Sequence, residues 1–241
     1  MIKSNNISFL ALLCISTMFL APVANAYKVQ PMVAEMAPIG KKAQLSLRLE
    51  NNDSESLTVE MVPLKLILNA SGQVEYIPAD DDLLIIPVTA VLKPGRSQAV
   101  MVRYLGQPDI TQSEAYSVGF RQIPVNIEGQ ESSQVSMAVN FNTLINVVPA
   151  NAKPNLAVEK MILKDGQWHI TINNSGNSYT RLSHTQWLVS DGVTSVKLNK
   201  EKLAELVSGN LFLPNSSRTL TIKPIEKLSM DNLDIKINIM K

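Results

Sequence analysis

Few side chains in this sequence are suited to catalysis or metal binding. It has two histidines, His169 and His184, and neither has a second histidine or a cysteine at metal-site spacing. A zinc site needs three or four donors, so both are interpreted as structural or surface residues. The acidic run at residues 80–82 lacks the spaced oxygen ligands of a calcium loop and is interpreted as a solvated turn. We therefore expect no metal and no cofactor.

Motifs for covalent catalysis and nucleotide binding are also absent from the printed sequence. It contains no Gly-x-Ser-x-Gly turn, no glycine-rich phosphate loop and no basic–aromatic patch. The net charge of +1 gives no general attraction to nucleic acid or to a membrane surface. A binding protein without catalytic residues is predicted. Scattered carboxylates can converge in a fold, so a hydrolytic sandwich enzyme stays as an alternative.

The first 26 residues have the order of a secretory signal peptide. Lys3 precedes an apolar stretch over residues 7–20, and Ala24-Asn-Ala26 is a small-x-small cleavage site. The stretch is too short for a membrane span with stop-transfer flanks. We expect cleavage after Ala26 and export. The only cysteine, Cys14, would leave with this segment, so the exported chain would contain no disulfide. Leu13 before it argues against lipidation.

The exported part shows strand periodicity almost throughout. Large apolar residues alternate with polar ones at residues 45–49, 100–104 and 116–120. Turn signals such as Lys-Pro-Gly-Arg at residues 93–96 separate these runs. Short alternating strands with turns every 8–12 residues or so predict an antiparallel β-sandwich.

Two domains are expected on either side of a proline-bounded connector. Residues 149–154 begin and end in proline and carry no apolar pattern, and strand patterns restart after them. A short helical turn is predicted at residues 203–207. We place the first domain at residues 27–150 and the second at residues 151–241, with both tryptophans, Trp168 and Trp187, in a core.

The longest regular strand pattern covers residues 135–149. Its large apolar side chains alternate on one face, at Val135, Met137, Val139 and Phe141. The opposite face carries small or amide side chains. These four residues could face a partner protein or the core of the chain's own sandwich, and the sequence leaves both possibilities open.

Several segments, in order, resemble the periplasmic pilus chaperones of the chaperone–usher pathway. Residues 92–103 read Leu-Lys-Pro-Gly-Arg-Ser-Gln-Ala-Val-Met-Val-Arg, and residues 114–124 read Glu-Ala-Tyr-Ser-Val-Gly-Phe-Arg-Gln-Ile-Pro. The strand over 135–149 follows where that family has its donor strand. Asn-Ser-Gly-Asn-Ser-Tyr-Thr-Arg-Leu at 174–182 and Phe-Leu-Pro-Asn-Ser at 212–216 resemble parts of the family's second domain.

The resemblance implies an all-β fold of two immunoglobulin-like sandwich domains in a boomerang arrangement. It implies a chaperone in the periplasm that completes pilin subunits with its donor strand and delivers them to an outer-membrane usher. Val135, Met137, Val139 and Phe141 would be the subunit-binding side chains. No nucleic acid or membrane insertion is expected. Because an exposed apolar strand aggregates readily, a self-capping homodimer is a further possibility.

The sequence departs from the family at the basic residues that anchor a subunit's C-terminal carboxylate. The two expected positions fall at Glu35 and Leu144, and neither is basic. Lys28, Arg103 and Arg121 are the nearest basic candidates. These departures indicate a divergent branch, of the archaic or alternate kind.

The family also has an arginine in an ion pair that orients the two domains. Here that position matches Arg103, with Glu114 as its expected partner. The main alternative function is a structural pilin-like or adhesin-like module. Pilins usually carry a disulfide and an alternating N-terminal extension, and the predicted mature chain has neither feature.

Overall fold

The computed structural model describes residues 27–69, 73–124, 138–207, 209, 211–229 and 232–240 of the 241-residue chain. The predicted signal peptide, residues 1–26, lies outside these residues, as do two of the predicted donor residues, Val135 and Met137. Within the described ranges, no helix is long and apolar enough to cross a membrane.

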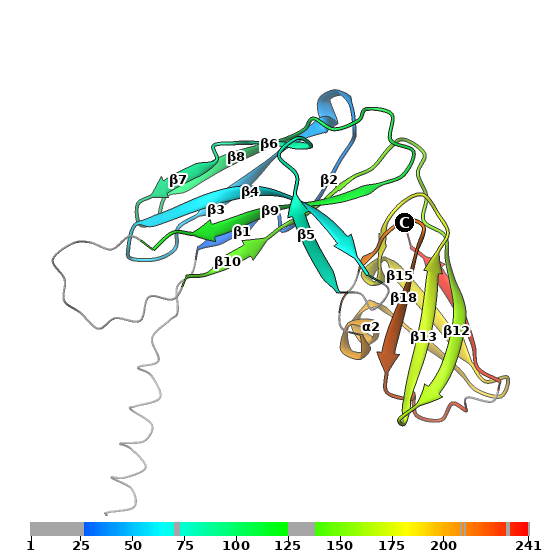
Figure 1. Cartoon of the computed structure of the whole chain (residues 1–241). Coiled ribbons are helices and arrows are strands. Elements are labelled where there is room, and N and C mark those ends of the chain that lie inside the picture. Colours follow the sequence, from blue (N-terminus) through cyan, green and yellow to red (C-terminus); the bar gives the residue numbers. More distant parts are fainter. Residues whose placement is uncertain are drawn as a thin grey trace, which may run out of the picture.

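The described chain is built almost entirely of β-strands, which form two lobes joined at an angle (Figure 1). The first lobe is a sandwich of a four-stranded sheet, ordered β1-β3-β8-β6, and a seven-stranded sheet, ordered β2-β11-β9-β4-β5 with β10 on β9 and β7 on β4. Its elements are β1 (Lys28–Gln30), β2 (Val33–Met36), η1 (Gly40–Ala43), β3 (Gln44–Glu50), β4 (Leu57–Leu68), β5 (Val74–Pro78), β6 (Leu83–Ile86), β7 (Thr89–Leu92), β8 (Ser97–Tyr104), β9 (Glu114–Gln122), β10 (Asn140–Asn142) and β11 (Leu144–Val147).

Period-two alternation creates the core of the first lobe. Leu47 of β3 lies opposite Val100 of β8, and Met61 of β4 lies opposite Phe120 of β9. All four side chains are buried between the two sheets. Burying such a side chain stabilises the fold by about 1.5–3 kcal/mol.

The second lobe is a smaller sandwich with its own core. Its main sheets have the orders β12-β13-β18 and β16-β15-β19, and β14 pairs with β17. The elements are β12 (Leu156–Lys164), β13 (Gln167–Asn174), β14 (Thr180–Arg181), η2 (Leu182–His184), β15 (Thr185–Ser190), β16 (Ser195–Leu198), α2 (Lys200–Leu206), β17 (Leu211–Phe212), β18 (Ser216–Ile222) and β19 (Asp234–Ile239).

Two tryptophans from facing sheets occupy the centre of this second core. Trp168 of β13 and Trp187 of β15 are fully buried, which confirms that both are core residues. The expected helical turn is present as α2, and the side chain of Asn199 caps its start by accepting a hydrogen bond from the Lys202 N–H. The predicted all-β fold with two sandwich lobes is therefore confirmed.

The lobes meet across the outer face of the seven-stranded sheet. A separate buried cluster joins Leu66 and Ala115 of the first lobe to Tyr179 and Leu211 of the second. Residues 149–155 connect the lobes without forming a helix or strand. The lobe angle therefore depends on packing and polar contacts as well as on the connector.

Replacing Phe120 by alanine should leave a cavity in the first core and lower the free energy of unfolding by about 3–5 kcal/mol. Chemical denaturation with circular dichroism measures this change. Val91→Ala is the control, because Val91 is exposed and its truncation should cost less than about 0.5 kcal/mol. Equal losses in the two variants would contradict the described core.

Candidate functional site

The strongest candidate site is the free edge of β10. On one side, β10 pairs antiparallel with β9, and Phe141 lies opposite Phe120. On the other side, none of the strands in the described part of the chain pairs with it. An unpaired edge presents backbone N–H and C=O groups that can hydrogen-bond to a strand of another chain. The edge can therefore accept an additional strand.

Two of the predicted donor residues, Val139 and Phe141, lie at this edge and pack partly against the first lobe's own core. Phe141 shares the core-facing side of the sheet with Phe120, its pairing partner. Both side chains are only half-buried, because no described neighbouring strand covers their outer flank. The two interpretations left open by the sequence are thus compatible: one flank touches the chain's own core and the other is available to a partner.

Tyr27 holds the start of this edge strand in place. Its hydroxyl donates to the carbonyl oxygen of Val139 at 2.7 Å, and its ring meets that of Phe141 edge-on at 4.8 Å between centroids. Burial raises the pKa of Tyr27 to about 12, against a smaller opposing effect of the Arg121 charge. The hydroxyl therefore stays protonated and remains a donor at neutral pH.

Polar side chains of β9 also fix the edge strand, Arg121 from the outer face of the sheet and Gln122 from its core-facing side. The Arg121 guanidinium donates to Asn142 Oδ1 at 2.9 Å, and the N–H of Val139 donates to Gln122 Oε1 at 3.0 Å. The Arg121 side chain passes close to Gly119, where an added Cβ would come within 2.9 Å of its guanidinium. The glycine thus gives Arg121 the space to reach β10. Arg121 is positioned to orient the edge strand by this contact.

Thr143 marks the point where the open edge ends. Its hydroxyl accepts from the N–H of Val118 at 3.0 Å, and its own N–H donates to the carbonyl of Val118 at 3.1 Å. Immediately afterwards, Leu144 begins the parallel pairing of β11 with β2, opposite Val33. The segment 140–147 is therefore open along its first half and covered along its second.

The positions expected to hold basic anchors have a different chemistry. Glu35 of β2 accepts a hydrogen bond from the hydroxyl of Tyr179 in the second lobe. Leu144 packs with the apolar cluster between the lobes. The pKa of Tyr179 is raised by burial first and by its bond to Glu35 second. Glu35 already places a carboxylate at this position. Binding of a subunit's C-terminal carboxylate there is therefore disfavoured.

The remaining basic candidates are spread over the first lobe. Lys28 is exposed on β1, at the edge of the four-stranded sheet. Arg103 is exposed on β8 in the interior of the same sheet, and Arg121 is engaged with Asn142. The structure does not bring these three side chains together into one pocket.

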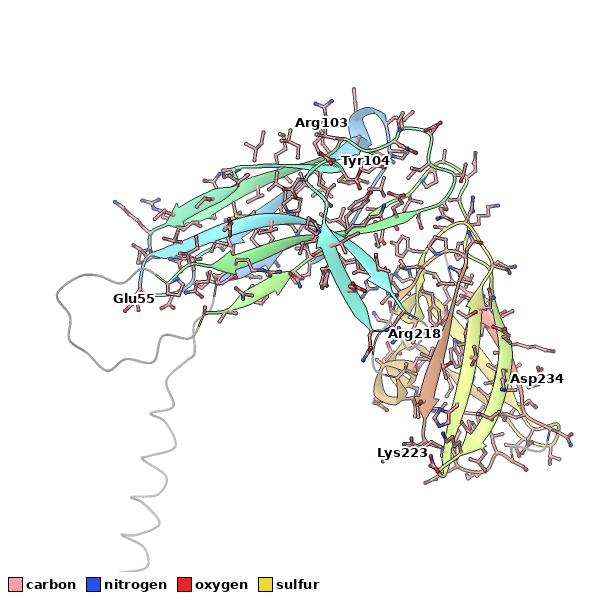
Figure 2. All side chains as sticks on the ribbon, in the orientation of Figure 1. Glu55, Arg103, Tyr104, Arg218, Lys223 and Asp234 are labelled. Atoms are coloured by element: carbon pink, nitrogen blue, oxygen red, sulfur yellow. The ribbon has the colours of Figure 1, made fainter. Side chains whose placement is uncertain are left out.

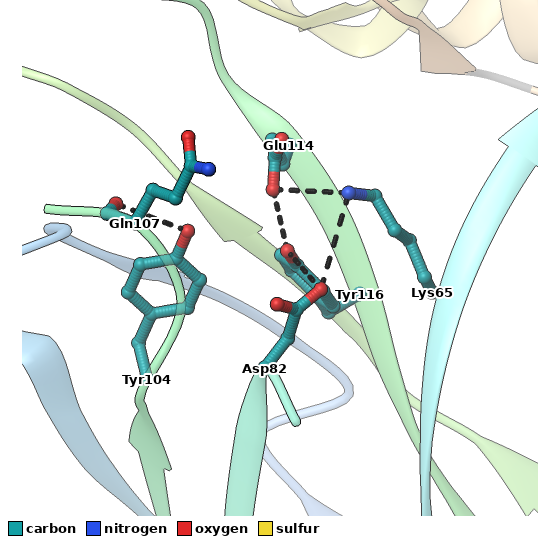
Figure 3. A network of polar contacts seen from close by, with 6 residues as sticks. All are labelled: Lys65, Asp82, Tyr104, Gln107, Glu114 and Tyr116. Atoms are coloured by element: carbon teal, nitrogen blue, oxygen red, sulfur yellow. Dashed lines mark hydrogen bonds and ion pairs between the residues drawn. The ribbon is translucent and has the colours of Figure 1, made fainter. Parts of the chain in front are cut away.

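Glu114 belongs to a polar network at one end of the first sandwich (Figure 3). Its partners are Lys65, at 3.2 Å, and the hydroxyl of Tyr116, which also lies 2.9 Å from Asp82. Within the described residues the ion-pair partner of Glu114 is Lys65, in place of the expected Arg103. The Lys65 ammonium also lies 5.3 Å from the centroid of the Tyr116 ring.

This network lies directly beside the contacts that join the lobes. The N–H of Ser113 donates to the carbonyl of Asn177 at 2.9 Å, and the Ser113 hydroxyl accepts from the N–H of Tyr179 at 2.7 Å. Asn177 also donates to the carbonyl of Thr111 at 3.0 Å. The start of β9 at Glu114 is thus held by Lys65 and Tyr116 within the first lobe and by the contacts of Ser113 with the second lobe.

Sequence reasoning missed Tyr27, Lys65, Ser113 and Tyr179. The sequence did carry a signal for Lys65. By strand alternation it lies on the same inward face of β4 as Val59 and Met61, where a lysine is unexpected. No pattern marks the other three, whose roles depend on contacts between distant segments. In the described ranges, no group of three or more histidine, cysteine, aspartate or glutamate residues could hold a metal ion.

Comparisons with solved structures show the same two-lobed fold in proteins of fimbrial assembly. The class 5 fimbriae chaperone CfaA matches at 15% identity and a TM-score of 0.57, covering 89% of this chain and 99% of that one. A chain of the CsuC–CsuE chaperone–tip subunit complex of Acinetobacter baumannii matches at 14% identity and 0.59, covering 89% and 98%. A chain of the Salmonella enterica SafA pilin–SafB chaperone complex matches at 14% and 0.56, covering 84% and 86%.

No protein-family model matches the sequence, and no curated protein matches it. At these identities the structural likeness shows the fold.

Replacing Tyr27 by phenylalanine should weaken the alkaline dependence of stability. The folded-state pKa of about 12 lies above the ordinary value of 10.0, so the folded state retains the proton between these values. Stability from this group is complete below about pH 10 and is lost as the pH rises toward 12. Urea unfolding between pH 9 and about 12 should show a shallower decline for Tyr27→Phe than for wild type. Identical slopes would contradict the buried-donor role.

Proposed function

We propose that this protein is a periplasmic chaperone that binds pilin-type subunits along the open edge of β10 and delivers them to an outer-membrane usher. It would belong to a divergent, archaic or alternate-like branch of the pilus chaperones. Residues 1–26 would direct its export. The matched structures include proteins named as fimbrial chaperones in complexes with a pilin or a tip subunit, which supports this class of partner.

The observation that carries the proposal is a strand edge that is rigid on one side and free on the other. β9, Tyr27, Gln122 and Arg121 hold the inner side of the edge strand. A subunit strand on the outer side would gain backbone hydrogen bonds worth about 0.5–1.5 kcal/mol each. Because the edge is already fixed, little further ordering of this chain is needed there, which lowers the entropic cost of binding.

Apolar side chains would supply the rest of the affinity. Val139 and Phe141 retain exposed flanks, and full burial of side chains of this size is worth about 1.5–3 kcal/mol each. Part of that gain is already realised in the chain's own core. Val135 and Met137 continue the same alternation and would extend the apolar contact along the subunit.

Subunit anchoring in this chain would not use a basic pair at the two expected positions. Glu35 is bonded to Tyr179, and Leu144 lies in the apolar cluster between the lobes. We propose that the strand edge itself provides most of the hold on the subunit. Lys28 is an exposed basic candidate on β1, at the edge of the four-stranded sheet.

Met137→Arg should abolish subunit capture, because a charge would enter the apolar surface offered to the subunit. The test is co-expression of the tagged protein with pilin-type subunits from its own cells, followed by affinity purification and quantification of the bound subunit. The matched control is Ala138→Arg, which changes the neighbouring residue on the opposite face of the strand.

We expect subunit recovery to fall at least tenfold for Met137→Arg and less than twofold for Ala138→Arg, with both variants folded. Circular dichroism and the thermal midpoint check folding. Loss of folding in Met137→Arg alone would place this residue in the chain's own core, and equal recovery with both variants would rule out this strand as the binding surface.

A further inference from the structure

The second lobe contains a pocket between η2 and α2. Its volume is about 380 Å³, within the range of roughly 300–1,000 Å³ that is usual for sites that hold small organic molecules. Gly209 lines the pocket and lies against the guanidinium of Arg218, with which an added Cβ would clash. Arg218 is buried on β18, at the end of the second lobe that faces the first (Figure 2). The pocket is thus separate from the open edge of β10, which belongs to the first lobe.

One face of α2 supplies much of the pocket lining. Lys200, Leu203, Ala204 and Val207 follow the spacing i, i+3, i+4 and i+7, which places them on the same side of a helix. Leu203 and Val207 are buried members of the second core, and Leu182 of η2 meets them from the other wall. Ala204 is small and leaves the space between these walls open. The floor of the pocket is therefore apolar.

The rim of the pocket is basic. Arg181 and His184 lie on one wall and Lys200 on the other, and no aspartate or glutamate is among the lining residues. Arginine and lysine side chains are cations at neutral pH. Within the described part of the chain, the side chains of Arg181 and Lys200 form no ion pair and no hydrogen bond. A pocket with unbalanced positive charge attracts an anion.

We propose that this pocket binds a small organic carboxylate with an unbranched apolar tail, of the medium-chain fatty acid class. The carboxylate would accept two parallel hydrogen bonds from the half-buried guanidinium of Arg181, a geometry that matches the two groups. Lys200 would add a second positive charge from the opposite wall. The tail would lie on the floor formed by Leu182, Leu203 and Val207.

A peptide C-terminus offers the same carboxylate but fits the floor less well. Its amide groups would lie over apolar side chains, where a polar group without a hydrogen-bond partner is costly. An alkyl chain carries no such groups, so the apolar floor favours the fatty acid. This inference does not rest on the proposed function, because subunit capture takes place at the first lobe and can stand or fail without it.

Isothermal titration calorimetry with octanoate, on the exported chain, measures this binding. Octanamide is the neutral probe of the same shape, and acetate is the anion without a tail. Octanoate should bind at least tenfold more tightly than either one, because only octanoate uses both the rim and the floor. N-acetyl-Gly-Leu, which carries its carboxylate on a peptide, should also bind more weakly than octanoate.

Two lysines of the same helix give matched variants. Lys200→Gln should weaken octanoate binding about threefold, the scale of an exposed ion pair, and should leave octanamide binding unchanged. Lys202→Gln removes the same charge from an exposed residue that does not line the pocket, so octanoate binding should stay at the wild-type value. Arg181→Gln should weaken octanoate binding at least tenfold, because it removes the bidentate donor. Both lysines are exposed, so their variants should keep the wild-type thermal midpoint.

Amide chemical shifts locate the bound probe. Addition of octanoate should shift the signals of Ser183, Ala204 and Gly209, which line the pocket. Shifts confined to residues 138–142 would place octanoate at the β10 edge and overturn the pocket, as would absence of octanoate binding or equal effects of Lys200→Gln and Lys202→Gln. Equal affinity for octanoate and octanamide would overturn the carboxylate, and tighter binding of N-acetyl-Gly-Leu would overturn the fatty acid as the ligand class.

Discussion

The backbone ladder between β9 and the segment 140–147 is the interaction on which the rest of the structure depends. The register is continuous from Asn140, opposite Arg121, to Val147, opposite Glu114. The same segment forms an open edge in its first half, is covered by β2 in its second half, and then enters the connector to the second lobe. Any change in this register would move apolar side chains to the wrong face of the sheet and shift the lobe junction as well.

The site therefore consists of one strand, β10, that is fixed in position and keeps an accessible outer edge. Tyr27 and Arg121 hold β10 from opposite faces of the sheet, and neither contact closes its outer edge. Exposed apolar strand edges are an aggregation hazard. A chain that carries one must therefore either bind a partner quickly or cover the edge by another contact.

The junction between the lobes is held by several weak contacts of different kinds. The cluster around Leu66 and Tyr179 supplies apolar packing, and Ser113 and Asn177 supply backbone hydrogen bonds. The Lys65–Glu114 pair lies beside them, but both side chains are about a quarter to a third exposed, so the pair itself contributes at most about 1 kcal/mol. The lobe angle thus depends on the combined surface, in contrast to a junction held by one buried ion pair.

The sequence predicted those features that depend on local periodicity. Alternation at Leu47, Val100 and Phe120 correctly predicted buried strands, and the tryptophan pattern correctly predicted a second core. It did not predict which residue pairs with Glu114, because Lys65 is 49 positions away and only the register of β4 on β9 brings the two together. For the same reason it did not show the bond from Tyr179 to Glu35. Alternation alone also left the face of Val139 and Phe141 open, since an edge strand can serve its own core and a partner with the same side chains.

The most direct test of the account is amide hydrogen exchange across residues 138–147 in the free protein and in a one-to-one mixture with a pilin-type subunit. The account predicts that exchange slows at the outward-facing amides of residues 138–142 when the subunit binds, while Ile145 to Val147, already paired on both sides, change little. Protection confined to other parts of the chain, with no change at residues 138–142, would contradict strand addition at β10.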